Sequence, residues 1–167
     1  VFTQAPIGYL SDKFDRRLII ILSTFGSALF ALLAIIFAGS SLEKMYLATE
    51  LGFSKILFFI SIALYAGLCL PLFSLNLAHT NDFVPKEKFV AAGGGLQLIF
   101  GIGAIGGPII CTLFMSWFGA NGFFIFLITF HIVIGVFALH RMNIRKTEAN
   151  PDSTFTPLPT TITPVGL

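Results

Sequence analysis

The stretch that decides the fold is Gly8-Tyr9-Leu10-Ser11-Asp12-Lys13-Phe14-Asp15-Arg16-Arg17. Five of the chain's eighteen Asp, Glu, Lys and Arg residues lie in its last six positions. The next twenty-five residues, Leu18–Leu42, carry no formal charge. A short, highly charged loop next to long apolar segments is typical of a multi-pass membrane protein that turns in the cytoplasm.

The composition also indicates a membrane protein. Hydrophobic residues make up 56% of the chain and charged residues only 11%, with twenty Phe, which is far from the average for a soluble domain. Charge-free runs of at least about 18 residues predict membrane spans, and three are present: Leu18–Leu42, Ile56–Asn81 and Phe89–His140. Because the third is long enough for two spans around a turn, we predict a polytopic all-α membrane protein.

We predict one partial span and four complete spans within a membrane domain at 1–146. They cover about 1–10, 18–38, 54–77, 90–115 and 123–140. The chain opens on a helix already under way and has no initiator Met, so we expect a fragment. Pro71 predicts a kink in the third span.

Three segments between or after the spans have their own character. Residues 42–53 mix charged and apolar side chains, as an amphipathic interfacial segment does. Residues 116–122 form a tight turn with an interfacial Trp. Residues 147–167, with six Thr and four Pro, are expected to form a disordered cytoplasmic tail.

The basic residues predict the orientation. If the opening loop is cytoplasmic, eight Lys and Arg residues lie on that side and only Lys44 and Lys55 lie on the other. This asymmetry follows the positive-inside rule and places the C-terminus in the cytoplasm. Basic residues sorted by membrane side do not form a nucleic-acid-binding face, so no nucleic-acid partner is expected.

The sequence shows no pattern that predicts enzymatic activity. It contains no nucleophile arrangement, no metal-ligand spacing and no nucleotide-binding loop, so neither a cofactor nor a metal is predicted. Cys69 and Cys111 both lie within apolar spans, where they are best explained as small hydrophobic residues.

The pattern Gly-x-Leu-x-Asp-Lys-x-x-Arg-Arg in the opening stretch resembles the signature cytoplasmic loop of the major facilitator superfamily (MFS). The resemblance extends over residues 1–146 and implies the helical bundle of one MFS half. This copy departs from the family pattern at Asp15, where Gly is usual. The resemblance implies that the loop latches the two halves in one conformation, and a simple positive-inside anchor is the alternative. The latch residues are Gly8, Asp12, Lys13, Arg16 and Arg17.

The same loop makes physical sense without the family. Gly8 permits close helix approach, Asp12 is suited to a helix N-terminus, and Arg16 and Arg17 can pair with carboxylates or lipid phosphates. The stretch 70–82 and the ending 155–159 resemble the C-terminal half of the YcaD-type bacterial branch. A first-half fragment that ends in the central loop is the alternative.

The fourth span is rich in glycine. Gly103 and Gly107 are spaced for close helix contact, and Gly106-Gly107-Pro108 weakens the helix enough to bend. In the resembling family this bending helix lines the central cavity.

Polar residues inside spans are candidates for a substrate site. Ser61, Tyr65 and Gln97 are our candidates for the cavity, with ordinary interhelical hydrogen bonding as the alternative. For His131, a neutral hydrogen-bonded state is favoured over a proton relay. Three further residues are candidates for a cytoplasmic gate, or else cap the next helix: His79, Asn81 and Asp82.

We therefore expect a secondary transporter in a bacterial inner membrane that moves a small solute by alternating access. Its partners would be the lipid bilayer, the small-molecule substrate and the missing N-terminal half of the same chain. The sequence leaves open the substrate, the direction of transport and proton coupling, including proton-coupled efflux. A non-transporting membrane scaffold or sensor subunit is the alternative.

Overall fold

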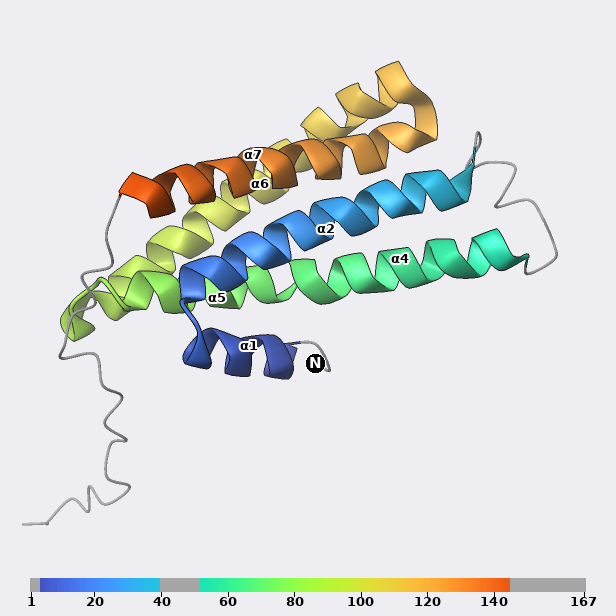
Figure 1. Ribbon diagram of the computed structural model, residues 1–167. Coiled ribbons are helices and arrows are strands. Elements are labelled where there is room, and N and C mark those ends of the chain that lie inside the picture. Colours follow the sequence, from blue (N-terminus) through green and yellow to red (C-terminus); the bar gives the residue numbers. More distant parts are fainter. Residues whose placement is uncertain (1–3, 40–51, 145–167) are drawn as a thin grey trace, which may run out of the picture.

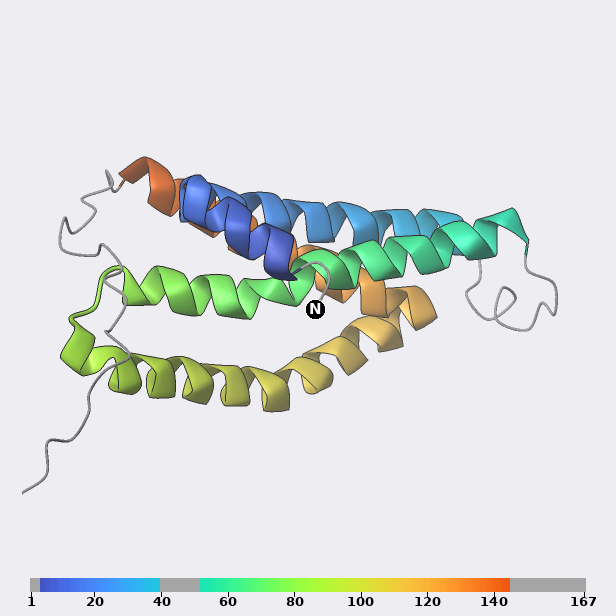
Figure 2. The ribbon, with the colours of Figure 1, turned by 90° about the horizontal axis from the view of Figure 1, so that it is seen from below.

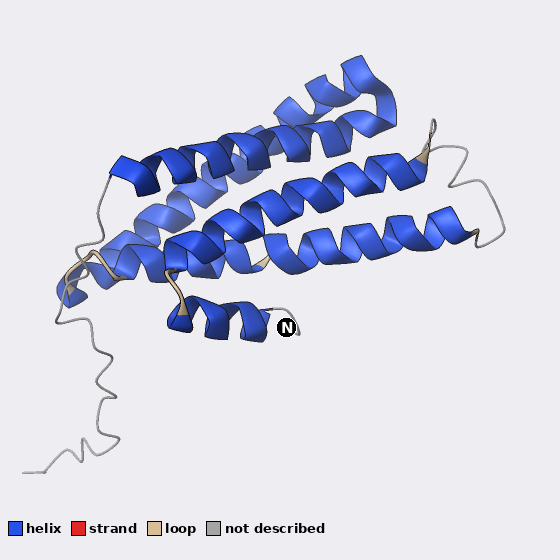
Figure 3. Ribbon diagram, in the orientation of Figure 1, coloured by secondary structure: helices blue, strands red, loops and turns tan. Residues whose placement is uncertain are grey.

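Helices make up the regular structure of the described residues. The computed structural model describes residues 4–39 and 52–144, and within them no strand is found (Figure 3). The helices, in chain order, are α1 (Gln4–Lys13), α2 (Arg16–Ala38), α4 (Phe53–Cys69), α5 (Pro71–Asn81), η1 (Lys86–Lys88), α6 (Phe89–Phe118), η2 (Gly119–Asn121) and α7 (Gly122–Ile144).

Three helical stretches are long and apolar enough to cross a membrane. They are Arg16–Ala38, Phe53–Asn81 and Lys86–Ile144. The third contains α6 and α7, which η2 joins into an antiparallel hairpin (Figure 1). The predicted all-α membrane fold is confirmed.

Helix α2 is the centre of the bundle and packs against both α4 and α7 (Figure 1). Its 23 residues span about 35 Å, enough to cross the hydrocarbon core. Small side chains occupy its buried face, since Ser27, Ala31 and Ala34 are at most 1% exposed. Phe58 of α4 and Phe124 of α7 pack into the same cluster. Small residues of this kind let neighbouring helices approach closely in a membrane.

The second membrane-crossing stretch, Phe53–Asn81, is divided into α4 and α5. The break falls at Leu70, directly before Pro71, the first residue of α5. Proline lacks the backbone N–H that would continue the helical ladder, so the break has a clear cause. The predicted kink at Pro71 is confirmed.

Helix α6 lies apart from the α2–α4 pair and bends in its second half (Figure 2). Pro108 lies inside this helix and cannot donate a hydrogen bond to the carbonyl of Ala104, which accounts for a bend there. No side chain of α6 is buried. The close contacts expected at Gly103 and Gly107 are not found, because a Cβ added to either would meet no atom within 4 Å among the described residues.

Several expected boundaries shift. Helix α1 continues to Lys13 instead of ending near residue 10, so the charged loop shrinks to Phe14 and Asp15. Helix α6 likewise continues to Phe118, which reduces the turn expected at 116–122 to the short η2. The interfacial segment, except for its last two residues, and the tail at 147–167 lie outside the described residues.

Candidate functional site

The joint between α1 and α2 depends on Asp15. This residue is the N-cap of α2, and its carboxylate accepts a hydrogen bond of 2.9 Å from the backbone N–H of Arg17. Its φ of −54° is ordinary for any L-residue. Asp is among the favoured N-cap residues because it satisfies a free N–H of the first turn. The substitution of Asp for the usual Gly therefore gives a capped helix start.

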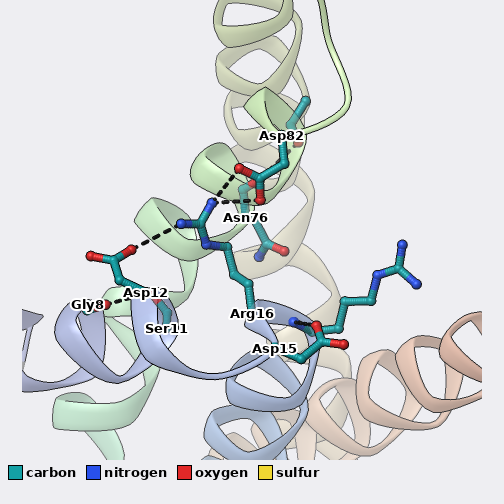
Figure 4. Close-up of polar contacts among 9 residues, drawn as sticks. Gly8, Ser11, Asp12, Asp15, Arg16, Asn76 and Asp82 are labelled. Atoms are coloured by element: carbon teal, nitrogen blue, oxygen red, sulfur yellow. Dashed lines mark hydrogen bonds and ion pairs between the residues drawn. The ribbon is translucent and has the colours of Figure 1, made fainter. Parts of the chain in front are cut away.

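Arg16 joins three helices into one cluster (Figure 4). Its Nη1 donates to Asp82 Oδ1 at 2.8 Å and to Oδ2 at 2.7 Å, and its Nη2 donates to Asp12 Oδ1 at 3.1 Å. Asp12 belongs to α1, Arg16 begins α2 and Asp82 caps α5. The structure thus brings together two predicted latch residues, Asp12 and Arg16, and one predicted gate residue, Asp82. The predicted pairing of Arg16 with carboxylates is confirmed. We call these three residues the Arg16 cluster.

The two ion pairs of the cluster differ in their exposure to solvent. The side chains of Arg16 and Asp82 are 20% and 42% exposed, whereas that of Asp12 is 71% exposed. Water screens an exposed pair more strongly, and charge-assisted bonds gain strength when they are sheltered. The Arg16–Asp82 pair is therefore the stronger of the two.

Apolar packing between α1, α2 and α5 accompanies the ion pairs of the Arg16 cluster. Ile19 and Ile20 of α2 pack against Leu75 of α5 in a buried group, and Ile7 of α1 lies against it. The close helix approach expected at Gly8 is not found, since no described atom comes within 4 Å of an added Cβ. The three helices at this end are therefore held by both apolar and ionic contacts.

The other predicted latch and gate residues surround the cluster. The Arg17 guanidinium lies 5.3 Å from the ring centre of Phe83, and the His79 ring lies 5.0 Å from the same ring. Lys13 lies 4.5 Å above the Tyr9 ring on the exposed side of α1. Asn81 Oδ1 is buried and has no hydrogen-bond partner among the described residues.

Two of the three substrate-cavity candidates, Ser61 and Tyr65, lie one turn apart on α4, whereas Gln97 lies on α6. Ser61 is buried and donates to the carbonyl of Leu57 at 2.8 Å, within its own helix. The Tyr65 ring lies 5.5 Å from that of His131 on α7, whereas Gln97 is exposed on α6. The hydrogen bond expected for His131 is confirmed.

His131 donates that bond from Nδ1 to the carbonyl of Leu127 at 2.8 Å, again within one helix. Cys69 and Cys111 are free thiols. Within residues 4–39 and 52–144, no three His, Cys, Asp or Glu side chains are grouped so as to hold a metal ion.

The chain was compared with known families and proteins. A family model described as Major Facilitator Superfamily matches residues 1–166, almost the full sequence. The chain belongs to this superfamily. Its members are membrane-embedded transporters of small molecules, which supports a transport function for this chain. No curated protein and no solved structure matches the chain.

Sequence reasoning missed that Asp82 is the partner of Arg16 in this superfamily member. The two residues are 66 positions apart, so no local spacing connects them. One signal was present, because the positive-inside rule placed both at the same membrane face with opposite charges. That rule gives the side of the membrane, but it does not tell which helix ends are neighbours.

Proposed function

We propose that this chain is the C-terminal half of a secondary active transporter in a bacterial inner membrane, and that the Arg16 cluster is its conformational latch. The transporter would move a small solute by alternating access, with the Arg16 end of the bundle in the cytoplasm. The resemblance of residues 70–82 to the YcaD-type branch supports this half and this source.

The observation that carries the proposal is the double pairing of Arg16. One guanidinium holds a carboxylate on α1 and another at the end of α5. Movement of α5 away from α1 and α2 breaks the bonds to Asp82, whereas the i,i+4 pair with Asp12 stays within one joint. Both ion pairs lie within the proposed half, so the Arg16 cluster would hold the ends of α1, α2 and α5 together as one unit, and its latch role toward the other half rests on the family resemblance.

The substrate-cavity candidates Ser61, Tyr65 and Gln97 stay part of this proposal. The bend of α6 at Gly106, Gly107 and Pro108 supplies the mobility that a cavity-lining helix needs. The gate role extends from Asp82 to His79 and Asn81 at the end of α5.

Transport by membrane vesicles tests the proposal. Vesicles that contain the full-length protein are loaded with a panel of small solutes, with and without a proton gradient, and solute movement is compared with that in vesicles lacking the protein. For a transported solute, Asp82→Asn should slow transport more than Asp12→Asn, because it removes the better protected ion pair. Membrane insertion of both variants should be unchanged.

A matched control removes a charge elsewhere at the same end. Lys86 lies in η1 and outside the Arg16 cluster, so Lys86→Gln should leave the transport rate unchanged. A charge exchange, Arg16→Asp with Asp82→Arg, should restore part of the rate lost in either single variant. Wild-type rates in Asp82→Asn would defeat the latch, and vesicles that move no solute would favour the scaffold alternative.

A further inference from the structure

A cavity lies at the same end of the bundle as the Arg16 cluster, between α2, α5 and α7. Its volume is about 460 Å³, within the range of pockets that hold small molecules. Polar side chains from all three helices face it: Arg17, Asn76, His79, Thr80 and Arg141.

The charged lining of this cavity is basic. Arg17 comes from the start of α2 and Arg141 from the end of α7, and the lining includes no Asp or Glu. The neighbouring carboxylate of Asp82 accepts two hydrogen bonds from Arg16. Two guanidinium groups present planar sets of donors that match the oxygens of a phosphate. The cavity therefore favours an anion, and a phosphate group in particular.

Phe83 organises the polar part of the cavity. Its ring lies under the Arg17 guanidinium at 5.3 Å and contacts the His79 ring at 5.0 Å. A cation over an aromatic face is attracted to it and loses freedom, so Arg17 is held in place before a ligand arrives.

The remaining wall of the cavity is apolar. Ile20 and Ile21 of α2 and Ile134, Phe137 and Ala138 of α7 line it. These residues belong to the membrane-crossing helices, whereas Arg17 and Arg141 lie near the helix ends. The cavity thus has a basic part near the helix ends and an apolar part along the membrane-crossing helices, which is the order of phosphate and acyl chains in a phospholipid.

We propose that this cavity binds an anionic phospholipid from the adjacent leaflet. The phosphate would lie between Arg17 and Arg141, and the glycerol and the first acyl carbons would lie against Phe137 and Ala138. This lipid site does not depend on the proposed transport function, and its test measures binding alone.

Native mass spectrometry of the purified full-length protein in a neutral detergent tests the proposal. The protein is titrated with phosphatidylglycerol or with phosphatidylcholine of the same acyl chains. We expect tighter binding of phosphatidylglycerol. Arg141→Gln and Arg17→Gln should each weaken it about fivefold, the usual contribution of one basic residue near an anionic lipid, with no change for phosphatidylcholine.

Two controls separate this site from other sources of binding. Lys88→Gln removes the same charge at the same end but outside the cavity, so it should not change the affinity. Ala138→Leu narrows the apolar wall while both arginines remain, so it should weaken binding of the lipid. Soluble glycerol 3-phosphate should compete with phosphatidylglycerol only weakly.

Three outcomes would overturn the proposal. Equal weakening by Lys88→Gln and Arg141→Gln would indicate diffuse surface charge. Equal binding of the two lipids would remove the role of the arginines. Competition by glycerol 3-phosphate as strong as by the lipid itself would indicate a site for soluble phosphate. Because Arg141 is exposed at the end of α7, Arg141→Gln should keep the wild-type melting temperature. If Arg17→Gln unfolds, the binding measured with Arg141→Gln is therefore enough to test the lipid site.

Discussion

Helices α2 and α6 are both long and apolar, yet they are packed in opposite ways. Ten of the 23 residues of α2 are buried, whereas none of the 30 residues of α6 is. Both helices are rich in small residues. In α2 these are mainly Ala and Ser at the contacts with α4 and α7. In α6 they are mainly Gly, and among these only Gly93 would bring an added Cβ within 4 Å of a described side chain, that of Leu77.

The difference teaches that small residues in a span serve two purposes. Ala keeps helix propensity high and still allows a neighbour to come close, which suits a rigid central helix. Gly and Pro lower helix propensity, which suits a helix that bends. The structure thus divides the bundle into a fixed centre around α2 and a bent outer helix α6.

The largest expected effect comes from enlarging a buried alanine of α2. Ala34 is 0% exposed and packs in the cluster that contains Phe58 and Phe124. Ala34→Leu should lower the free energy of unfolding by about 1–3 kcal/mol, as overpacking does. The same change at the exposed Ala104 of α6 should cost less than about 0.5 kcal/mol. Unfolding in detergent by SDS titration measures both, and equal losses would erase the contrast between the helices.

Two Gly→Ala changes should alter the free energy of unfolding by intermediate amounts and in opposite directions. A Cβ at Gly135 of α7 would come within 2.8 Å of the Phe25 ring of α2, so Gly135→Ala should cost about 1 kcal/mol after the gain in helix propensity. Gly107→Ala in α6 meets nothing within 4 Å and should add about 0.5–1 kcal/mol. The same titration applies.

A companion change tests the physical reason for the loss at Gly135. Phe25→Leu in the Gly135→Ala background should restore stability, because the shorter side chain leaves room for the new methyl group. If stability stays low in the double variant, the ring is not what limits this contact.

The smallest effect is expected from two threonines. Thr24 of α2 and Thr112 of α6 each donate to the carbonyl four residues earlier, at 2.7 Å in both cases. Because both hydroxyls bond within their own helix, Thr24→Val and Thr112→Val should each change the unfolding free energy by less than about 0.5 kcal/mol. A loss above about 1 kcal/mol at Thr24 alone would mean that its hydroxyl also bonds α4 or α7.

Charge-free runs and Pro71 were enough to predict the helices and the break between α4 and α5, because both depend on local chemistry. The central place of α2 was not predicted. The small residues Ala31, Ala34 and Ala38 indicated it, but the prediction for this span rested on its large apolar residues. The same small-residue reasoning failed at Gly103, since spacing alone does not provide a neighbour.

The candidate site was predicted in parts. The latch and gate candidates were predicted as separate groups, because side-chain pairing across three helices depends on how the helix ends meet. The Arg16–Asp82 pair and the cavity lined by Arg17 and Arg141 became visible only with the helices in place.

The joint of α1 and α2 has a mechanical consequence. Only Phe14 and Asp15 separate the two helices, and the Asp15 cap fixes the first turn of α2. Because the connection is this short, a rotation of α1 should also rotate the start of α2 and displace the Arg16 guanidinium. Two glycines inserted after Phe14 should weaken this coupling, so that a rotation of α1 is no longer passed to α2 while the Arg16–Asp82 pair stays closed.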